Sequence, residues 1–153
     1  VVVGANDLQS LYVANNVCSA VEYFRRLGGN VGVAGMVINK DDGTGEARRF
    51  AEGVGIPVLA TIPAHDEIRR KSASYQIVAR PGDTWAPLFE ELANNLSLAA
   101  PLQPKPLGGE ALLGLFSGQG AGQGVVMEPA TPADMRAQAH APKPSLEVIY
   151  DES

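Results

Sequence analysis

Apolar residues in the first hundred positions follow two patterns, short continuous runs and a spacing of three and four. Continuous runs are typical of strands buried on both faces of a parallel sheet, and they cover residues 1–3, 31–38 and 56–62. The spacing of three and four predicts helices over residues 6–27, 44–54, 66–71 and 84–98. Asn6 or Asp7 can cap the first helix, and Gly28 and Gly29 predict its end.

Strands that alternate with helices predict an α/β fold, with βαβ crossovers, a parallel sheet and helices on both of its faces. Three strands are fewer than the usual five or six in a sheet. The chain also opens in mid-strand without a starting Met. We therefore expect residues 1–100 to form part of a longer domain, with an incomplete sheet.

The last third of the chain has a different composition. Seven of the eleven prolines fall within residues 101–153, and a Gly-rich stretch covers residues 118–124. Such a composition buries too little apolar surface to offset the entropy of ordering. We expect a flexible Pro/Gly-rich tail over residues 118–153, or one that orders only on a partner. We expect residues 101–117 to form a docking extension, in which residues 110–116 can supply a helical turn or two.

Charge and composition exclude several classes of protein. A formal net charge of −5 argues against a general nucleic-acid binder, which needs clustered Lys and Arg. No run approaches the roughly 18 apolar residues of a membrane helix, and the N-terminus has no signal-peptide pattern, so we expect a cytoplasmic chain. The single cysteine, Cys18, excludes an internal disulfide and lies on an apolar helix face, where it suits the core.

Ligands of open parallel sheets bind outside the carboxyl ends of the strands, which selects the loops at residues 4–7, 39–45 and 63–67. Asn39 begins the second loop, directly after an apolar run. Its amide offers the donor and the acceptor that reading a purine edge requires, and Asn39-Lys40-Asp41-Asp42 fits the Asn-Lys-x-Asp pattern of guanine-specific GTPases. The simpler interpretation is a polar turn.

The loop that begins at Pro63 directly follows the next predicted strand, residues 56–62. Tips of adjacent strands lie roughly 5 Å apart, so this loop and Asn39 are expected to face one base from two sides. The Pro63 ring can cover the base while Ala64 and His65 offer backbone groups, and Asp66 is the expected N-cap of the following helix. The Ser-Ala turn of a GTPase is missing here, which favours adenine over guanine.

Several kinds of site are missing from the sequence. There is no G-x-x-x-x-G-K-[ST] phosphate loop. His65 and His140 lie far apart, and no second His or Cys flanks either of them at ligand spacing, so we expect no metal site. We also find no catalytic Ser/His/Asp set, so the chain by itself completes no active site.

Three stretches are similar to the nitrogenase-type iron proteins: ANDLQSLYVANN at residues 5–16, VAGMVIN at residues 33–39 and TIP at residues 61–63. Within that family, NNVCSAVEYFRRLGGNVGVAGMVINKDDGTGEARRFA and IRRKSASYQIV most resemble the iron-protein X subunits of chlorophyllide a reductases. The resemblance covers residues 1 to about 116, including PLQPKPLGGEALLGLF. It rests on long contiguous stretches rather than on a short motif.

The resemblance implies a homodimeric P-loop ATPase of bacteriochlorophyll synthesis, with ATP and Mg²⁺ and one [4Fe–4S] cluster between the two subunits. Such a protein takes electrons from a ferredoxin-type donor and passes them to a catalytic component of two further subunits. By resemblance, Asn39 reads adenine, the backbone of residues 63–65 lies against the adenosine, and Arg69 is a nucleotide-side polar residue. The phosphate loop and both cluster cysteines would precede Val1, and Cys18 matches neither cysteine.

Other assignments stay open from the sequence. The iron proteins of protochlorophyllide reductase and of nitrogenase are the nearest alternatives. A partition-type ATPase has the same fold but often carries a basic amphipathic C-terminal helix, which this tail lacks. An inactive truncated remnant is the third alternative.

Overall fold

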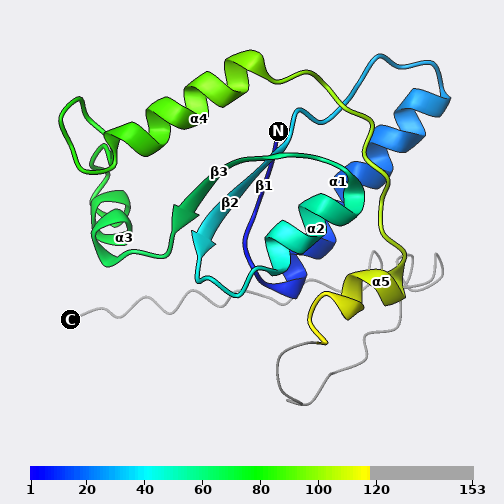
Figure 1. Ribbon diagram of the computed structural model, residues 1–153, viewed down its shortest axis with the longest axis horizontal. Coiled ribbons are helices and arrows are strands. Elements are labelled where there is room, and N and C mark those ends of the chain that lie inside the picture. The colour runs from blue at the N-terminus through cyan, green and yellow to red at the C-terminus, as the bar shows by residue number, and fades with distance from the viewer. Residues whose placement is uncertain (118–153) are drawn as a thin grey trace, which may run out of the picture. The chain divides into compact units, whose positions relative to one another are not determined.

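The computed structural model describes residues 1–117, so the flexible tail predicted for residues 118–153 lies outside the described residues. The described part alternates strands and helices, as the sequence predicts (Figure 1). Its elements, in chain order, are β1 (Val2–Gly4), α1 (Leu8–Arg26), β2 (Met36–Asp41), α2 (Glu46–Val54), β3 (Val58–Pro63), α3 (Asp66–Ala73), α4 (Ala86–Leu98) and α5 (Gly109–Gly114).

The three strands form one parallel sheet in the order β1-β2-β3. Val3 of β1 lies opposite Val37 of β2, and Ile38 lies opposite Thr61 of β3. The α/β fold with a parallel sheet and flanking helices is therefore confirmed. All three strands end at one edge of the sheet, where their following loops gather.

The core lies between the sheet and the first two helices. Side chains of β1 and β2 join those of α1 and α2 in one cluster, which includes Leu11 and Phe50, both fully buried. Figure 1 shows α1 and α2 on one side of the strands and α3 and α4 on the other. The second face is covered near β3, where Leu59 is buried, but Val3 of β1 is 61% exposed among the described residues.

The middle strand begins later than the apolar run of residues 31–38 predicts. Val33 forms an isolated antiparallel bridge instead, with both of its backbone hydrogen bonds to Leu102 at 2.9 Å. The close approach needs Gly32, because a Cβ there would lie 2.8 Å from the Leu102 carbonyl oxygen. At its other end β2 continues to Asp41, so Asn39 lies within the strand rather than in a loop.

Helix α1 begins and ends through specific side-chain and backbone contacts. Asp7 is the N-cap, since its carboxylate accepts a hydrogen bond from the Ser10 N–H at 2.8 Å; Asn6, the other candidate, has a different role described below. At the C-terminus, the N–H groups of Gly28 and Gly29 donate to the carbonyls of Arg25 and Phe24 at 2.9 Å. Gly28 has φ +86°, the left-handed conformation that ends helices.

The extension over residues 101–117 packs on the body of the domain. Leu112 of α5 is 4% exposed and belongs to the core cluster, and Leu115 and Phe116 pack against it. None of the helices within residues 1–117 has the length and apolar character needed to cross a membrane.

Candidate functional site

The ends of β2 and β3 bring two of the predicted nucleotide-binding segments together. Asp41 lies opposite Pro63 in the sheet, and the Ala64 N–H donates to the Asp41 carbonyl at 2.9 Å. Asn39 is therefore two residues from the contact that joins its strand to the segment 63–65. The two segments therefore lie close together where β2 and β3 end.

The Asn39 side chain is half-buried near the end of β2. The polar turn after it is made by other residues: the Gly43 N–H donates to Asp41 Oδ1 at 3.2 Å, and the Thr44 N–H donates to Asp42 Oδ1 at 3.2 Å. Across residues 1–117, no side-chain hydrogen bond engages Asn39, whereas its neighbours form several. A polar turn is thus present, but it does not occupy the Asn39 amide.

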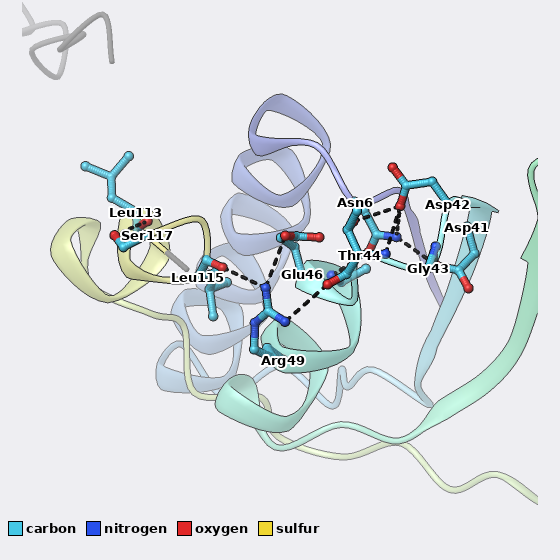
Figure 2. A network of polar contacts seen from close by, with 11 residues as sticks. Asn6, Asp41, Asp42, Gly43, Thr44, Glu46, Arg49, Leu113, Leu115 and Ser117 are labelled. Carbon is cyan, nitrogen blue, oxygen red and sulfur yellow. Dashed lines mark hydrogen bonds and ion pairs between the residues drawn. The ribbon is translucent and has the colours of Figure 1, made fainter. Parts of the chain in front are cut away.

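Asn6 ties the β1–α1 loop to the β2–α2 loop (Figure 2). Its amide nitrogen donates to Asp41 Oδ1 and to Asp42 Oδ1, both at 2.7 Å. Its amide oxygen accepts from the Ala47 N–H at 2.9 Å, in the first turn of α2. Both the nitrogen and the oxygen of the Asn6 amide are therefore engaged in contacts with the β2–α2 region, which explains why Asn6 does not cap α1.

The same contacts favour the ionised form of Asp42. The Thr44 hydroxyl donates to Asp42 Oδ1 at 2.7 Å. This bond, together with those from Asn6 and from the Thr44 N–H, lowers the pKa of the Asp42 carboxyl from its ordinary value. The β2–α2 loop is consequently held by a carboxylate that stays charged at neutral pH.

The α3 end of the site differs from the sequence prediction. His65, not Asp66, is the N-cap of α3, since His65 Nδ1 accepts from the Glu67 N–H at 3.2 Å and Asp66 is the first helical residue. The physical reason is that extended backbone at His65, with φ −131°, lets the imidazole nitrogen reach the free N–H of the first turn. Arg69 is exposed and forms an ion pair with Asp66 at 3.4 Å.

An aromatic residue from a distant part of the chain, Trp85, packs against His65. The Trp85 ring lies 4.9 Å from the His65 ring, centroid to centroid, with the planes tilted by 59°. The indole Nε1 donates to Glu67 Oε2 at 3.2 Å, and Lys71 bridges Glu67 and Asp83 at 3.2 and 3.4 Å. Trp85 thus fixes the position of His65 and joins the start of α4 to α3.

Hydrogen bonds and charges within this group shift three pKa values. Contacts with Lys71 and with the Trp85 indole lower the pKa of Glu67. The Arg80 N–H and the Lys71 ammonium lower the pKa of Asp83. Hydrogen bonds to Glu67 and Asp83 raise the pKa of Lys71. All three side chains therefore carry their charges at neutral pH.

Acidification is expected to change the fluorescence of Trp85, the single tryptophan of the chain. A carboxylate with a lowered pKa contributes stability above its ordinary pKa, here 4.5, and loses it as the pH falls through the folded-state value. The indole–Glu67 bond should therefore persist at pH 4.5 and break below it. Emission spectra of the chain and of Glu67→Gln, recorded down through the carboxyl range, test this. The Glu67→Gln spectra should lack that step, and an identical step in both proteins would contradict the assignment.

Residues 1–117 do not fit an iron–sulfur cluster. Such a cluster is held by several thiolates, whereas Cys18 is fully buried in α1 and burial raises the pKa of its thiol. Within residues 1–117, no group of three or more His, Cys, Asp or Glu side chains could hold a metal ion. Neither is a phosphate loop present in the sequence.

Two of the side chains that shape this site, Trp85 and Asn6, are not among the nucleotide-binding residues that the sequence predicts. The sequence places Trp85 only within the predicted helix 84–98, and Asn6 only in the loop at residues 4–7 and among the capping candidates. The presence of two adjacent capping residues, Asn6 and Asp7, where one suffices, was a signal that the first has another role. No comparable signal linked Trp85 to His65, because twenty positions separate them.

Comparisons with known proteins add to this geometry. The family model described as "4Fe-4S iron sulfur cluster binding proteins, NifH/frxC family" matches residues 1–121. The chain is 64% identical over 153 residues, all of its length, to the chlorophyllide reductase 35.5 kDa chain of Cereibacter sphaeroides, of which it covers 46%. It is 64% identical over 152 residues, 99% of its length, to the chain of that name from Rhodobacter capsulatus, again covering 46%.

More distant relatives are similar over a shorter range. The light-independent protochlorophyllide reductase iron-sulfur ATP-binding protein of Chloroherpeton thalassium is 31% identical over 128 residues, which is 76% of this chain and 46% of that protein. The chain therefore spans about half the length of the curated relatives that it matches.

Proposed function

The chain belongs to the NifH/frxC family of 4Fe-4S iron sulfur cluster binding proteins, and from that premise we propose that it supplies the adenine side of the ATP site in an iron protein of chlorophyllide a reductase. The full-length protein would be an oxidoreductase component that couples ATP hydrolysis to electron donation in bacteriochlorophyll synthesis. This segment would contribute nucleotide recognition to that reaction.

One observation carries the choice of substrate. Identity to the two relatives named chlorophyllide reductase is 64% over essentially the whole chain. Identity to a relative named for protochlorophyllide reductase is 31% over 128 residues. The difference favours chlorophyllide a over protochlorophyllide as the pigment that the catalytic component reduces.

Within this proposal, each side chain at the strand ends has a role. Within residues 1–117 the half-buried Asn39 side chain forms no hydrogen bond, and it lies two positions before the residue that pairs with Pro63. There it would donate to and accept from the adenine edge. The Pro63 ring, with the backbone of Ala64 and His65, would cover the base. Arg69 is exposed one helical turn further on, where it would contact the polar side of the nucleotide.

The remaining machinery would come from outside these residues. A cluster held between two copies of the full-length chain requires cysteines that this segment lacks, and cradling the β- and γ-phosphates with Mg²⁺ requires a phosphate loop. We further propose a cytoplasmic homodimer that accepts electrons from a ferredoxin-type donor. Its electrons would pass to a catalytic component of two further subunits.

Anaerobic reconstitution with iron and sulfide tests the proposal directly. The 153-residue chain should bind no [4Fe–4S] cluster and hydrolyse no ATP, since its single thiol is buried and no phosphate loop is present. The full-length protein should bind the cluster, visible by absorbance and electron paramagnetic resonance. With its catalytic component it should then reduce chlorophyllide a in an ATP-dependent reaction.

Two results would refute the assignment. A stable cluster on the 153-residue chain would mean that Cys18 serves as a ligand. A full-length protein that reduces protochlorophyllide or dinitrogen, but not chlorophyllide a, would move the chain to one of the sibling reductases.

A further inference from the structure

The extension over residues 101–117 is held to the domain by contacts along its whole course. The buried Asn15 side chain of α1 binds the Leu107 backbone twice: its Nδ2 donates to the Leu107 carbonyl at 2.9 Å, and its Oδ1 accepts from the Leu107 N–H at 2.8 Å. The Lys105 N–H donates to the Val54 carbonyl at the end of α2 at 2.9 Å. These contacts place α5 and the turn after it beside the first turns of α2.

Arg49 of α2 joins the end of the extension to the β2–α2 loop. Its Nη2 donates to the Leu115 carbonyl at 2.9 Å, and its Nη1 donates to the Thr44 carbonyl at 3.3 Å. Figure 2 shows the guanidinium between these two carbonyls, one from each segment. A planar guanidinium with fixed donors suits such a bridge better than a flexible ammonium does.

Glu46 sets the position of that guanidinium. Its side chain is 4% exposed, and Oε1 pairs with Arg49 Nη2 at 3.1 Å. Across the part of the chain that the structure describes, Oε2 of Glu46 has no hydrogen-bond partner. A buried carboxylate is costly unless it is paired, so the arginine has an energetic reason to stay in place.

From Thr44 the hydrogen bonds continue to the adenine side of the site. Thr44 donates to Asp42, and Asn6 donates to both Asp42 and Asp41. The Asp41 carbonyl accepts from the Ala64 N–H at 2.9 Å. A continuous series of polar contacts therefore links the Leu115 carbonyl of the extension to the segment proposed to cover the base.

We propose that Arg49 is a positioning residue that couples docking of the C-terminal extension to the shape of the β2–α2 loop, and thereby to nucleotide affinity. The inference rests on the proposed function, because the affected ligand is ATP at the Asn39 site. If the extension undocks, Arg49 loses the Leu115 carbonyl, one of the two carbonyls that hold it. The β2–α2 loop, which Arg49 contacts through Thr44, would then be held less firmly. By linkage, ATP binding must tighten docking of the extension by the same factor.

The test uses the full-length protein and measures ATP binding in Arg49→Ala, Leu112→Ala and the double variant. Leu112→Ala removes the buried anchor of α5, and each single variant should weaken ATP binding about 5-fold or more, a usual size for coupling between sites. The double variant should lose no more than the stronger single variant, because both break the same link. Effects that multiply would overturn the proposal.

Matched variants separate coupling from loss of structure. Arg26→Ala removes an arginine that forms an ion pair with Glu22, one turn earlier in α1. Leu113→Ala truncates the neighbour of Leu112, which is 56% exposed. Both variants should bind ATP normally. Arg49→Lys keeps the charge beside Glu46 but cannot reach both carbonyls, so it should keep the melting temperature while losing affinity. Wild-type affinity in Arg49→Lys and Arg49→Ala would overturn the proposal.

Hydrogen exchange supplies a readout that does not depend on activity. ATP should slow amide exchange in residues 109–117 of the wild-type protein and leave it unchanged in Arg49→Ala. If the wild-type protein binds no ATP, the proposed function itself fails. If it binds ATP but exchange in the extension does not respond, the coupling alone is refuted.

Discussion

Replacing Asn39 with alanine is expected to weaken ATP binding by the full-length protein by about 1–3 kcal/mol, or roughly 5- to 150-fold. The Asn39 side chain is half-buried in β2, two positions before Asp41, which lies opposite Pro63. Alanine would leave the donor and the acceptor of the adenine edge without partners in a site from which water has been displaced. Isothermal titration calorimetry with ATP measures the loss directly.

Lys40→Ala is the matched control, because it shortens the exposed side chain next to Asn39 in the same strand. It should leave ATP affinity nearly unchanged, apart from weak charge effects that added salt suppresses. An Asn39→Ala protein that binds ATP as tightly as the wild type would remove Asn39 from the site. The adenine assignment would then rest on the segment 63–65 alone.

Replacing Phe50 with alanine is expected to lower the free energy of unfolding by about 3–5 kcal/mol. Phe50 is fully buried in the core cluster, on the helix that follows the β2–α2 loop. Total stability of a domain is about 5–15 kcal/mol, so the loss is a large share of it. Urea unfolding followed by circular dichroism measures the change.

Glu52→Ala tests whether that loss comes from the core. Glu52 is exposed on the same helix, and a surface substitution there should change stability by only about 0.5 kcal/mol. A Phe50→Ala protein as stable as Glu52→Ala would mean that α2 does not pack on the sheet as described.

The order and type of the elements could be predicted because each depends on local pattern. The spacing of apolar residues in α1 and the turn at Gly28 and Gly29 act within a few positions. The start of β2 depends on a distant contact: Val33 pairs with Leu102, sixty-nine positions later, which removes it from the parallel sheet. An apolar run shows that residues are buried but not which segment they pair with.

Only those parts of the candidate site that lie at the strand ends could be predicted from the sequence. That Asn39 and the segment 63–65 lie close together follows from the rule that parallel strands end at one edge, although Asn39 itself lies within β2. His65 replaced Asp66 as the cap because backbone angles, which the sequence does not reveal, decide which side chain reaches the free N–H. Arg49 resembled an ordinary surface arginine, since its acceptor, the Leu115 carbonyl, carries no sequence signal.

The exposed valine of β1 has a practical consequence for anyone who expresses this segment. Within the described residues β1 pairs only with β2, so its other edge offers unpaired backbone groups next to an apolar side chain. An open apolar edge is a template for strands of other molecules. The isolated chain would accordingly self-associate as its concentration rises, and a lysine in place of Val3 would be the simplest way to keep it dispersed.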